Sequence, residues 1–309
     1  MKTTRELAGS LCLLLAVAGC TAEEVPTGQG PVVVATTSIL GDIASGVVGE
    51  EGEVEVLIPL GADAHDFAPS AQQVSLISTA DLVVANGLGL ESGLQDVLAS
   101  AADDGVPVIE LAPLVDPLPL PSPQGAEGGE DGDRDLDPHF WMDPVRVADA
   151  AVALGDEMAG LVPDGDWRQR AADYAAEMSS AHAVIGDLLD GIAPDQRQMI
   201  TNHESFGYFA ERYGFEILGV VIPGGSTLAE PSSAHLADLI GLMRETGARV
   251  IFAETSQPST LADAVAAEMG DEVEVVELFT ESLGGPGSGA ETLPAMLIAN
   301  AELIASALG

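Results

Sequence analysis

Four side chains that could bind a divalent cation are spread along the chain, and each lies in a turn-like stretch of sequence. They are His65 in GADAHDFAPS, His139 in DLDPHFWMDP, His203 in ITNHESFGYF and Glu281 in LFTESLGG. The chain has five histidines, and these three are each next to Pro, Asp or Asn. Imidazole nitrogens and carboxylate oxygens are the ligands that a small divalent cation takes in proteins. We therefore expect a metal site if the fold brings the four side chains together.

Other polar residues compete for a place in this site. Glu254 follows a predicted strand and could complete the set in place of Glu281, or it could accept a hydrogen bond from a ligating imidazole. Asp66 is expected in the loop or behind the ligands. His182, on a predicted long helix, is expected to be a solvated surface residue. His235, near a helix start, is expected to bind a capping or loop group.

Apolar β-rich runs alternate with helical patterns in two blocks of the chain. Short continuous apolar runs are typical of parallel strands buried on both faces, and the alternation predicts right-handed βαβ units. The first block has predicted strands at 32–36, 54–59, 82–85 and 106–111, and helices at 38–48, 71–78 and 91–102. The second has predicted strands at 198–201, 216–222, 249–253 and 273–279, and helices at 205–213, 234–245, 261–269 and 290–308.

Two helical patterns separate the blocks. Asp143 as N-cap and Pro144 at the first helical position predict a helix that ends near residue 160, and a longer pattern covers 164–189. The sequence thus predicts an α/β fold with two lobes, each with a four-stranded, mainly parallel sheet flanked by helices, joined by one long helix. The expected boundaries are 31–162 for the N-terminal lobe, 163–192 for the linking helix and 193–309 for the C-terminal lobe.

The candidate ligands occupy the positions where such sheets bind. Ligands of open α/β sheets collect at the carboxyl ends of the strands. His65, His203 and Glu281 each follow a predicted strand end, and His139 lies in a loop before a helix. We therefore expect a site in the cleft between the lobes. The Pro-rich, acidic stretch 113–137 fits no packed element and predicts a flexible acidic loop just before His139; the role of 127–137 stays open.

The first residues resemble an export signal. Lys2 and Arg5 precede a short apolar run at 11–17, which is too short for the roughly 20 residues of a membrane-spanning helix. Val17-Ala18-Gly19-Cys20 resembles a bacterial lipobox. It implies a signal peptide at 1–19, cleavage before Cys20, lipid on that cysteine and a tether over 20–30. Without Cys12 and Cys20 no disulfide can form, so the fold must rest on its core.

The charge is strongly acidic, with 10 basic and 50 acidic residues and a net charge of −40. Such a chain should repel nucleic acid and anionic membrane surfaces, so we expect no nucleic-acid partner. The attraction of cations by this charge is unselective, so we interpret the charge as adaptation to salty surroundings or as a source of solubility.

Four motifs together carry a family resemblance over essentially the whole chain after the signal. They are AHDFAPS, DPHFWMDP, NHESFGYFAERYG and ELFTESLG. In them the chain resembles the metal-binding lipoproteins of bacterial ABC importers, the cluster A-I solute-binding proteins that capture zinc or manganese. The resemblance implies two α/β lobes, a rigid connecting helix and one buried metal between the lobes. It also implies a monomer outside the cytoplasm, lipid-anchored, that delivers its metal to a membrane permease.

The resemblance places the first three ligands on His65, His139 and His203. The family's fourth ligand is usually an aspartate, and here Glu281 takes that position with one more methylene. Manganese members usually have a glutamate at the third position, and manganese favours oxygen ligands. Three imidazoles therefore favour Zn²⁺, with Mn²⁺ as the alternative.

Other functions need other features. A surface adhesin of the same fold remains an alternative. A zinc hydrolase, the distant alternative, needs an open coordination position and a nearby general base. A metalloprotease helix would need a second histidine four residues after His203, where the chain has Gly207. The sequence therefore predicts a binding protein rather than an enzyme.

Overall fold

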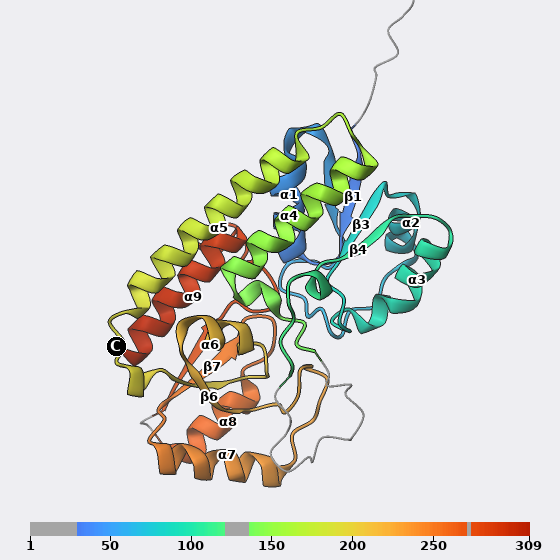
Figure 1. Cartoon of the computed structure of the whole chain (residues 1–309). Helices are drawn as coiled ribbons and strands as arrows, with labels where there is room; N and C mark the ends of the chain where they lie inside the picture. The colour runs from blue at the N-terminus through green and yellow to red at the C-terminus, as the bar shows by residue number, and fades with distance from the viewer. Residues whose placement is uncertain (1–29, 121–135, 271–272) are drawn as a thin grey trace, which may run out of the picture.

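The computed structural model describes residues 30–120, 136–270 and 273–309, and it has two α/β halves with a separate sheet in each (Figure 1). The N-terminal sheet has the strand order β2-β1-β3-β4, and the C-terminal sheet has the equivalent order β6-β5-β7-β8. Every paired strand in both sheets is parallel. The strands are β1 (Val32–Ala35), β2 (Glu53–Val56), β3 (Leu82–Ala85), β4 (Val108–Glu110), β5 (Gln198–Thr201), β6 (Glu216–Val220), β7 (Val250–Glu254) and β8 (Glu274–Leu278). The predicted α/β fold with two four-stranded sheets is thus confirmed.

The central strands are buried because helices cover the sheets. β3, with the sequence LVVA, is buried at every position, and β1 differs only at its first residue. This burial on both faces explains why these strands are continuous apolar runs instead of alternating patterns. The helices of the N-terminal half are α1 (Ser38–Val48), α2 (Ala71–Thr79) and α3 (Gln95–Asp103), and those of the C-terminal half are α6 (Gly207–Tyr213), α7 (Ser233–Thr246) and α8 (Thr260–Met269).

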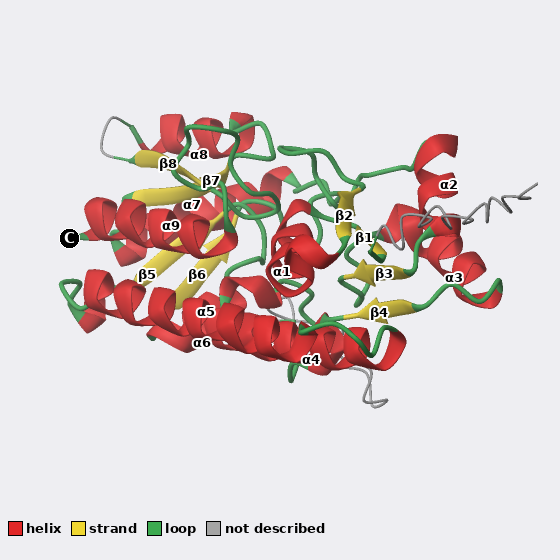
Figure 2. Cartoon of the chain, turned by 90° about the horizontal axis from the view of Figure 1, so that it is seen from above, coloured by secondary structure: helices red, strands yellow, loops and turns green. Residues whose placement is uncertain are grey.

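Three long helices connect the halves. They are α4 (Pro144–Leu161), α5 (Trp167–Leu189) and α9 (Leu293–Leu308). Seen from above, the two sheets lie at opposite ends of the molecule, with α4 and α5 along one side and α1 between (Figure 2). α5 packs against α4, α1 and α9. The last helix of the chain therefore returns beside the predicted linking helix, a pairing that the sequence pattern did not indicate.

Side chains cap two of these helices, and the cap predicted at Asp143 is confirmed. Thr37 accepts a hydrogen bond from the backbone N–H of Leu40 at 3.2 Å and caps α1. Asp143 accepts one from Val145 at 2.9 Å, with Pro144 at the first position of α4. These caps start two helices beside the loops that enter the space between the halves.

The flexible acidic loop predicted at 113–137 is described only at its two ends. Residues 121–135 lie outside the described part, and with them most of the segment 127–137. Its ends, however, are paired: Pro119 and Leu136 form an antiparallel bridge. Asp137 is 1% exposed, because it is hydrogen-bonded within the site described below. Asp137, the last residue of the predicted flexible loop, is thus part of the packed structure.

Several short 3-10 helices connect these elements. They span Gly49–Glu51, Ser92–Leu94, Ala112–Leu114, Phe140–Met142 and Pro194–Gln196. The helix predicted from residue 91 begins instead with one of these turns, because the Glu91 side chain is buried and accepts hydrogen bonds from Thr36, Asn86 and Gly87. Among the described residues, no helix combines the length and the hydropathy that crossing a membrane requires.

Candidate metal centre

The four candidate side chains meet where the carboxyl ends of the two sheets face each other. His65 lies in the loop after β2, and His139 precedes the turn that leads into α4. His203 lies two residues beyond β5, and Glu281 three residues beyond β8. One donor atom from each lies within 4.8 Å of the others, and all four residues are buried. The fold thus brings together the four residues that the sequence singled out.

The spacing of these atoms fits a small tetrahedral ion. Nε2 of His139 lies 3.4 Å from Nε2 of His65 and 3.2 Å from Nε2 of His203. Oε1 of Glu281 lies 3.5 Å from Nε2 of His139 and 3.6 Å from Nε2 of His203. Ligands about 2.0–2.1 Å from a tetrahedral zinc ion lie about 3.3–3.4 Å from one another. These four separations are therefore close to those that such an ion imposes, while Oε2 of Glu281 lies further from Nε2 of His65, at 3.9 Å.

Glu281 has no other partner that would explain its burial. It is 2% exposed, and neither carboxylate oxygen accepts a hydrogen bond from a described residue. A buried carboxylate without partners is costly, so it normally pairs with a cation or takes up a proton. Burial raises the pKa of Glu281 to about 7, against the opposing effect of His139 and His203. A bound cation would supply the missing partner.

Glu254 stands behind His203 instead of beside the other donors. Its Oε1 lies 2.5 Å from Nδ1 of His203, and both side chains are fully buried. Burial by itself would lower the pKa of His203, but the charge and hydrogen bond of Glu254, with a smaller effect of Glu281, raise it to about 9. This contact leaves Nε2 of His203 directed at the cluster, as in metal sites where a carboxylate orients the ligating imidazole.

Asp137 and Trp141 orient the next two donors. Oδ1 of Asp137 lies 2.7 Å from Nδ1 of His139 and accepts the backbone N–H of the same residue at 2.9 Å. The Trp141 ring packs edge-on against His139. Its Nε1 donates to the carbonyl of Thr280 at 2.7 Å, next to Glu281. Trp141 thus packs against one donor, and its hydrogen bond connects the two segments that carry His139 and Glu281.

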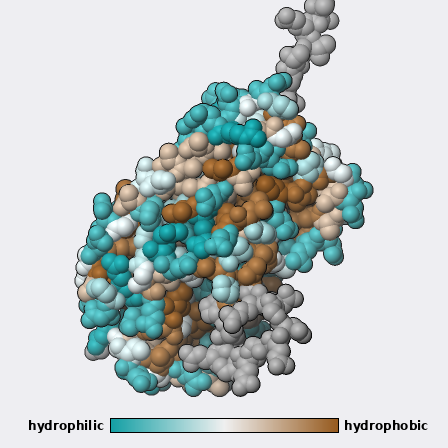
Figure 3. All heavy atoms as spheres, viewed as in Figure 1, coloured by the Kyte–Doolittle hydropathy of each residue, from teal (hydrophilic) through white to brown (hydrophobic). Residues whose placement is uncertain are grey.

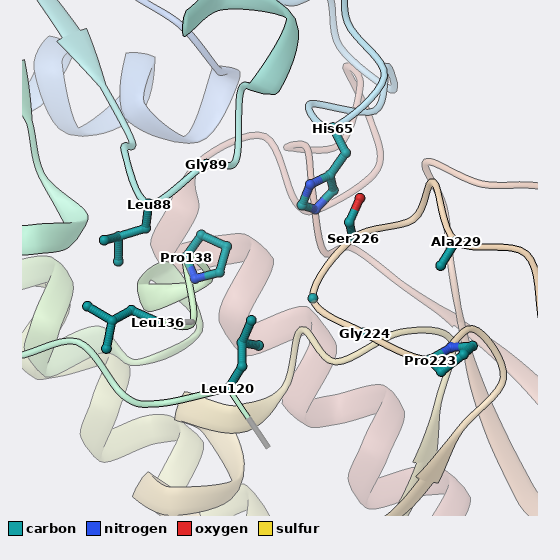
Figure 4. A pocket seen from close by; sticks show the side chains of 11 residues that line it. His65, Leu88, Gly89, Leu120, Leu136, Pro138, Pro223, Gly224, Ser226 and Ala229 are labelled. Carbon is teal, nitrogen blue, oxygen red and sulfur yellow. The ribbon is translucent and has the colours of Figure 1, made fainter. Parts of the chain in front are cut away.

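His65 is the donor nearest to the outside. It lines a groove of about 550 Å³ between the halves, whereas His139 and His203 have no exposed surface. Figure 4 shows His65 directed into this groove, opposite the loop with Gly224 and Ser226. Burial, followed by the neighbouring His139 and His203, lowers the pKa of His65 to about 2. The neutral form that binds metals is thus favoured at His65.

Apolar side chains surround the groove. Leu88, Leu120, Leu136 and Pro138 line it from the N-terminal half. Leu88 has a left-handed backbone, with a φ of 54°, a conformation that costs a branched residue energy and often occurs at functional sites. The space-filling view shows apolar atoms gathered where the two halves meet (Figure 3). The groove therefore has apolar side chains on one wall and reaches the donor His65.

The remaining candidates lie elsewhere. Asp66 is exposed. Nε2 of His235 lies 2.9 Å from the carbonyl of Val220, which confirms the predicted loop contact. The prediction of a solvated His182 was wrong: the residue is half-buried, and its Nδ1 lies 3.0 Å from the Tyr213 hydroxyl, because α5 packs here against the C-terminal half.

Sequence reasoning missed Asp137, and it missed Asp63, whose Oδ1 accepts the backbone N–H of His65 at 2.9 Å. Both aspartates precede a donor histidine by two residues. This shared Asp-x-His spacing was a usable signal, because an aspartate in a turn often binds a backbone N–H two residues on.

Comparisons with known proteins find a family match over most of the chain. The family model described as zinc-uptake complex component A, periplasmic, matches residues 33–307. A manganese-binding lipoprotein, MntA of Halalkalibacterium halodurans, is 29% identical over 303 residues, which is 96% of each chain. A zinc-binding protein, TroA of Treponema pallidum, is 28% identical over 287 residues, 90% of this chain and 89% of the other.

Solved structures share the two-lobed fold. The periplasmic zinc-binding protein TroA from Treponema pallidum superposes with a TM-score of 0.79 at 25% identity, over 91% of this chain and 99% of that one. The manganese-bound periplasmic metal-binding protein from Candidatus Liberibacter asiaticus has a TM-score of 0.77 at 23% identity, over 90% of this chain and all of that one; this second likeness concerns the fold alone.

Proposed function

The chain belongs to the zinc-uptake complex component A family, and from this premise we propose that it captures Zn²⁺ outside the cytoplasm and delivers it to the permease of an ABC importer. The proposed ligands are Nε2 of His65, His139 and His203, with the carboxylate of Glu281. The metal is the cargo and not a cofactor.

One observation carries this proposal. The two oxygens of Glu281 are buried without a hydrogen bond from any described residue, and they face three imidazole nitrogens at 3.5 to 3.9 Å. Without an ion, this arrangement is an unpaired buried carboxylate, which is expensive. With an ion, every group in it has a partner.

The donor set supports Zn²⁺ over Mn²⁺. Three imidazoles and one carboxylate suit zinc, whereas manganese favours oxygen ligands and more of them. Relatives named for either metal are similar to this chain to nearly the same degree, so Mn²⁺ is the second candidate. The tetrahedral spacing of the donors is the observation that favours zinc.

The site supports binding rather than catalysis. A zinc hydrolase needs a metal-bound water and a general base close to it. Two additional carboxylates adjoin the donors, and each is engaged with the Nδ1 of a donor histidine: Glu254 with His203 and Asp137 with His139. Four protein donors also suffice for a tetrahedral ion. We therefore keep the hydrolase, and an adhesin of the same fold, as outcomes that the experiment below could reveal.

The location and the partner follow from the same proposal. The signal at 1–19, the lipid on Cys20 and all of the tether at 20–30 except Gly30 lie outside the described residues. We propose that they anchor a monomer to the membrane beside its permease, with lobes at 31–162 and 193–309 and the linker at 163–192. In cells that make Cys20→Ser, the protein is expected in the soluble fraction, whereas unchanged membrane association contradicts the lipid anchor.

The test is a competitive metal titration on the chelator-stripped full chain. Zn²⁺ and Mn²⁺ compete at equal concentration, and bound metal is counted per chain. His203→Glu is measured in parallel, with His182→Gln as a control that removes a histidine outside the cluster.

Each outcome has a distinct meaning. One tightly held zinc per chain, weakened in His203→Glu and unaffected in His182→Gln, supports the proposal. If manganese displaces zinc, the metal assignment fails and the manganese importer takes its place. If no stoichiometric metal binds, the capture function fails, and assays for hydrolysis and surface adhesion follow.

A further inference from the structure

Asp63 connects the two halves of the protein through a single carboxylate. Its Oδ1 accepts the backbone N–H of His65, two residues further along the same loop, at 2.9 Å. Its Oδ2 accepts hydrogen bonds from Oγ1 of Thr227 and Nε2 of Gln257, each at 2.5 Å. Thr227 lies in the loop after β6, and Gln257 lies in the loop after β7. One side chain therefore joins the loop that carries His65 to two loops of the C-terminal half.

The contrast with Asp137 shows what is particular to Asp63. Both aspartates precede a donor histidine by two residues, and both accept its backbone N–H at 2.9 Å. Asp137 also contacts the ring of its own histidine. Asp63 instead directs its second oxygen across the cleft. Asp137 is thus placed to orient a ring, and Asp63 is placed to respond to the distance between the halves.

His65 is also the donor on the path to the outside. It lines the groove between the halves, opposite Gly224, Gly225 and Ser226, which directly precede Thr227 (Figure 4). The other proposed donors are enclosed by the carboxyl ends of the strands. An ion that leaves through this groove passes His65. One wall of the groove is the loop that contains Thr227, which donates a hydrogen bond to Asp63.

We propose that Asp63 is a positioning residue that holds His65 on the metal only while the two halves are closed. This rests on the metal-capture function proposed above. When the halves are closed, Thr227 and Gln257 donate hydrogen bonds to the Asp63 carboxylate. The same carboxylate accepts the backbone N–H of His65 and so fixes the position of that residue. When the C-terminal loops move away, the carboxylate loses both donors, the His65 loop is freed, and the ion loses its outermost ligand first. Lobe opening is a common motion in ligand-binding proteins, and here it would break the hydrogen bonds of Asp63.

The test separates the two oxygens of Asp63. In Asp63→Asn, the amide oxygen can still accept the N–H of His65, but the amide nitrogen cannot accept from Thr227 and Gln257. Thr227→Val with Gln257→Leu removes the same bonds from the opposite side without touching the His65 loop. Asp66→Asn is the matched control, because it removes the same charge from an exposed side chain one residue beyond His65. All variants are made in the full chain, and Zn²⁺ association and dissociation are measured by stopped-flow with a chromophoric chelator.

The expected result is a split between the two rates. Asp63→Asn and the Thr227/Gln257 double variant each release Zn²⁺ at least about tenfold faster, since hydrogen bonds to a charged group are lost, while association stays within about twofold because the open form already lacks them. The triple variant releases Zn²⁺ no faster than Asp63→Asn or the double variant, since all of these changes remove the same set of hydrogen bonds.

Three results decide the matter. The proposed role of Asp63 is contradicted if Asp63→Asn releases zinc at the parental rate. It is also contradicted if the rate increase in the triple variant equals the product of the increases in Asp63→Asn and the double variant. If Asp63→Asn loses affinity only because less of it is folded, its dissociation rate stays parental, which also contradicts the proposal. If the parent and Asp66→Asn themselves hold no zinc, the capture function has failed rather than the role of Asp63.

Discussion

Glu254 and His203 form a short contact at the end of adjacent strands, with 2.5 Å between Oε1 and Nδ1. The pair decides which nitrogen of His203 is free. With Nδ1–H committed to the carboxylate, Nε2 faces the other donors as the lone-pair nitrogen that a metal needs. Glu254, which the sequence left open as a ligand, is therefore placed to tune a ligand.

Glu254→Gln is expected to weaken Zn²⁺ binding by about 10- to 100-fold without changing the number of ions bound, as is common when a carboxylate behind a histidine is lost. Competitive titration with a fluorescent chelator measures the change. Glu277→Gln, at an exposed position of the neighbouring strand β8, is the control and should leave affinity unchanged. A loss of the bound ion altogether would make Glu254 a direct ligand and contradict the arrangement described here.

The affinity for Zn²⁺ is expected to rise with pH up to about 9, the pKa to which Glu254 raises His203 against the effect of burial. The ion must displace the Nε2 proton, so each pH unit below that value costs about tenfold in affinity. Below about pH 7 the Zn²⁺ affinity falls more steeply with decreasing pH, because Glu281 then also carries a proton that the ion must displace. Isothermal titration at several pH values measures this, and a flat profile from pH 6 to 9 would count against the histidine assignment.

The contribution of His203 to the stability of the metal-free protein changes with pH in the opposite direction to the Zn²⁺ affinity. The folded pKa of His203 is raised from 6.5, so its protonation stabilises the metal-free protein fully below 6.5, and this contribution is lost as pH rises through about 9. The thermal midpoint of the metal-free protein, compared with that of Glu254→Gln, isolates this effect. The difference between the two midpoints should shrink from pH 7 to 9.

Replacing Glu281 tests the unpaired carboxylate. Glu281→Gln removes the only anionic donor of the cluster and is expected to lower Zn²⁺ affinity by at least about 100-fold, because the charge opposite the ion is lost. In the absence of metal the same change should stabilise the fold, since a buried carboxylate without a partner disappears. The expected result is a lower Zn²⁺ affinity together with a higher stability of the metal-free protein. A decrease in both would show that Glu281 has a structural partner.

Asp143 is a stability determinant next to the site. It is fully buried and accepts hydrogen bonds from Arg146 at 2.8 Å and from Arg212 of α6 at 2.7 and 2.9 Å. Asp143→Ala is expected to lower the free energy of unfolding by about 3–5 kcal/mol, because Arg146 and Arg212 lose their shared buried anion and α4 loses its cap; Arg146 keeps Glu211 as a partner. Asp156→Asn, in an exposed pair with Arg168, should cost less than about 1 kcal/mol. Urea unfolding of the metal-free proteins compares the two.

The stability of the whole chain is expected to increase with salt. A net charge of −40 repels itself within a compact fold, and added ions screen this repulsion. The thermal midpoint of the metal-free protein should rise steeply from about 0.05 to about 1 M NaCl, where the Debye length shortens from over 10 Å to about 3 Å. A midpoint that does not change with salt would contradict the interpretation of the acidic composition as adaptation to salt.

The sequence alone determined much of the architecture. The apolar runs at β1 and β3 and the cap at Asp143 are local signals, and local signals can be interpreted correctly from sequence because neighbouring residues produce them. The four candidate donors could likewise be picked out, since histidines in turn-like motifs are few. Their role as ligands stays a prediction, although the fold has placed them together.

What only the tertiary structure decided are the contacts between segments far apart in the chain. Glu254 lies behind His203 and Asp63 reaches Thr227 and Gln257 because parallel strands bring their carboxyl ends to one edge, and no local pattern records which loops meet there. The burial of Asp137 and the pairing of His182 with Tyr213 were missed for the same reason. A residue's type and spacing predict what it can bind, whereas its burial and its partners depend on how the two halves pack against each other.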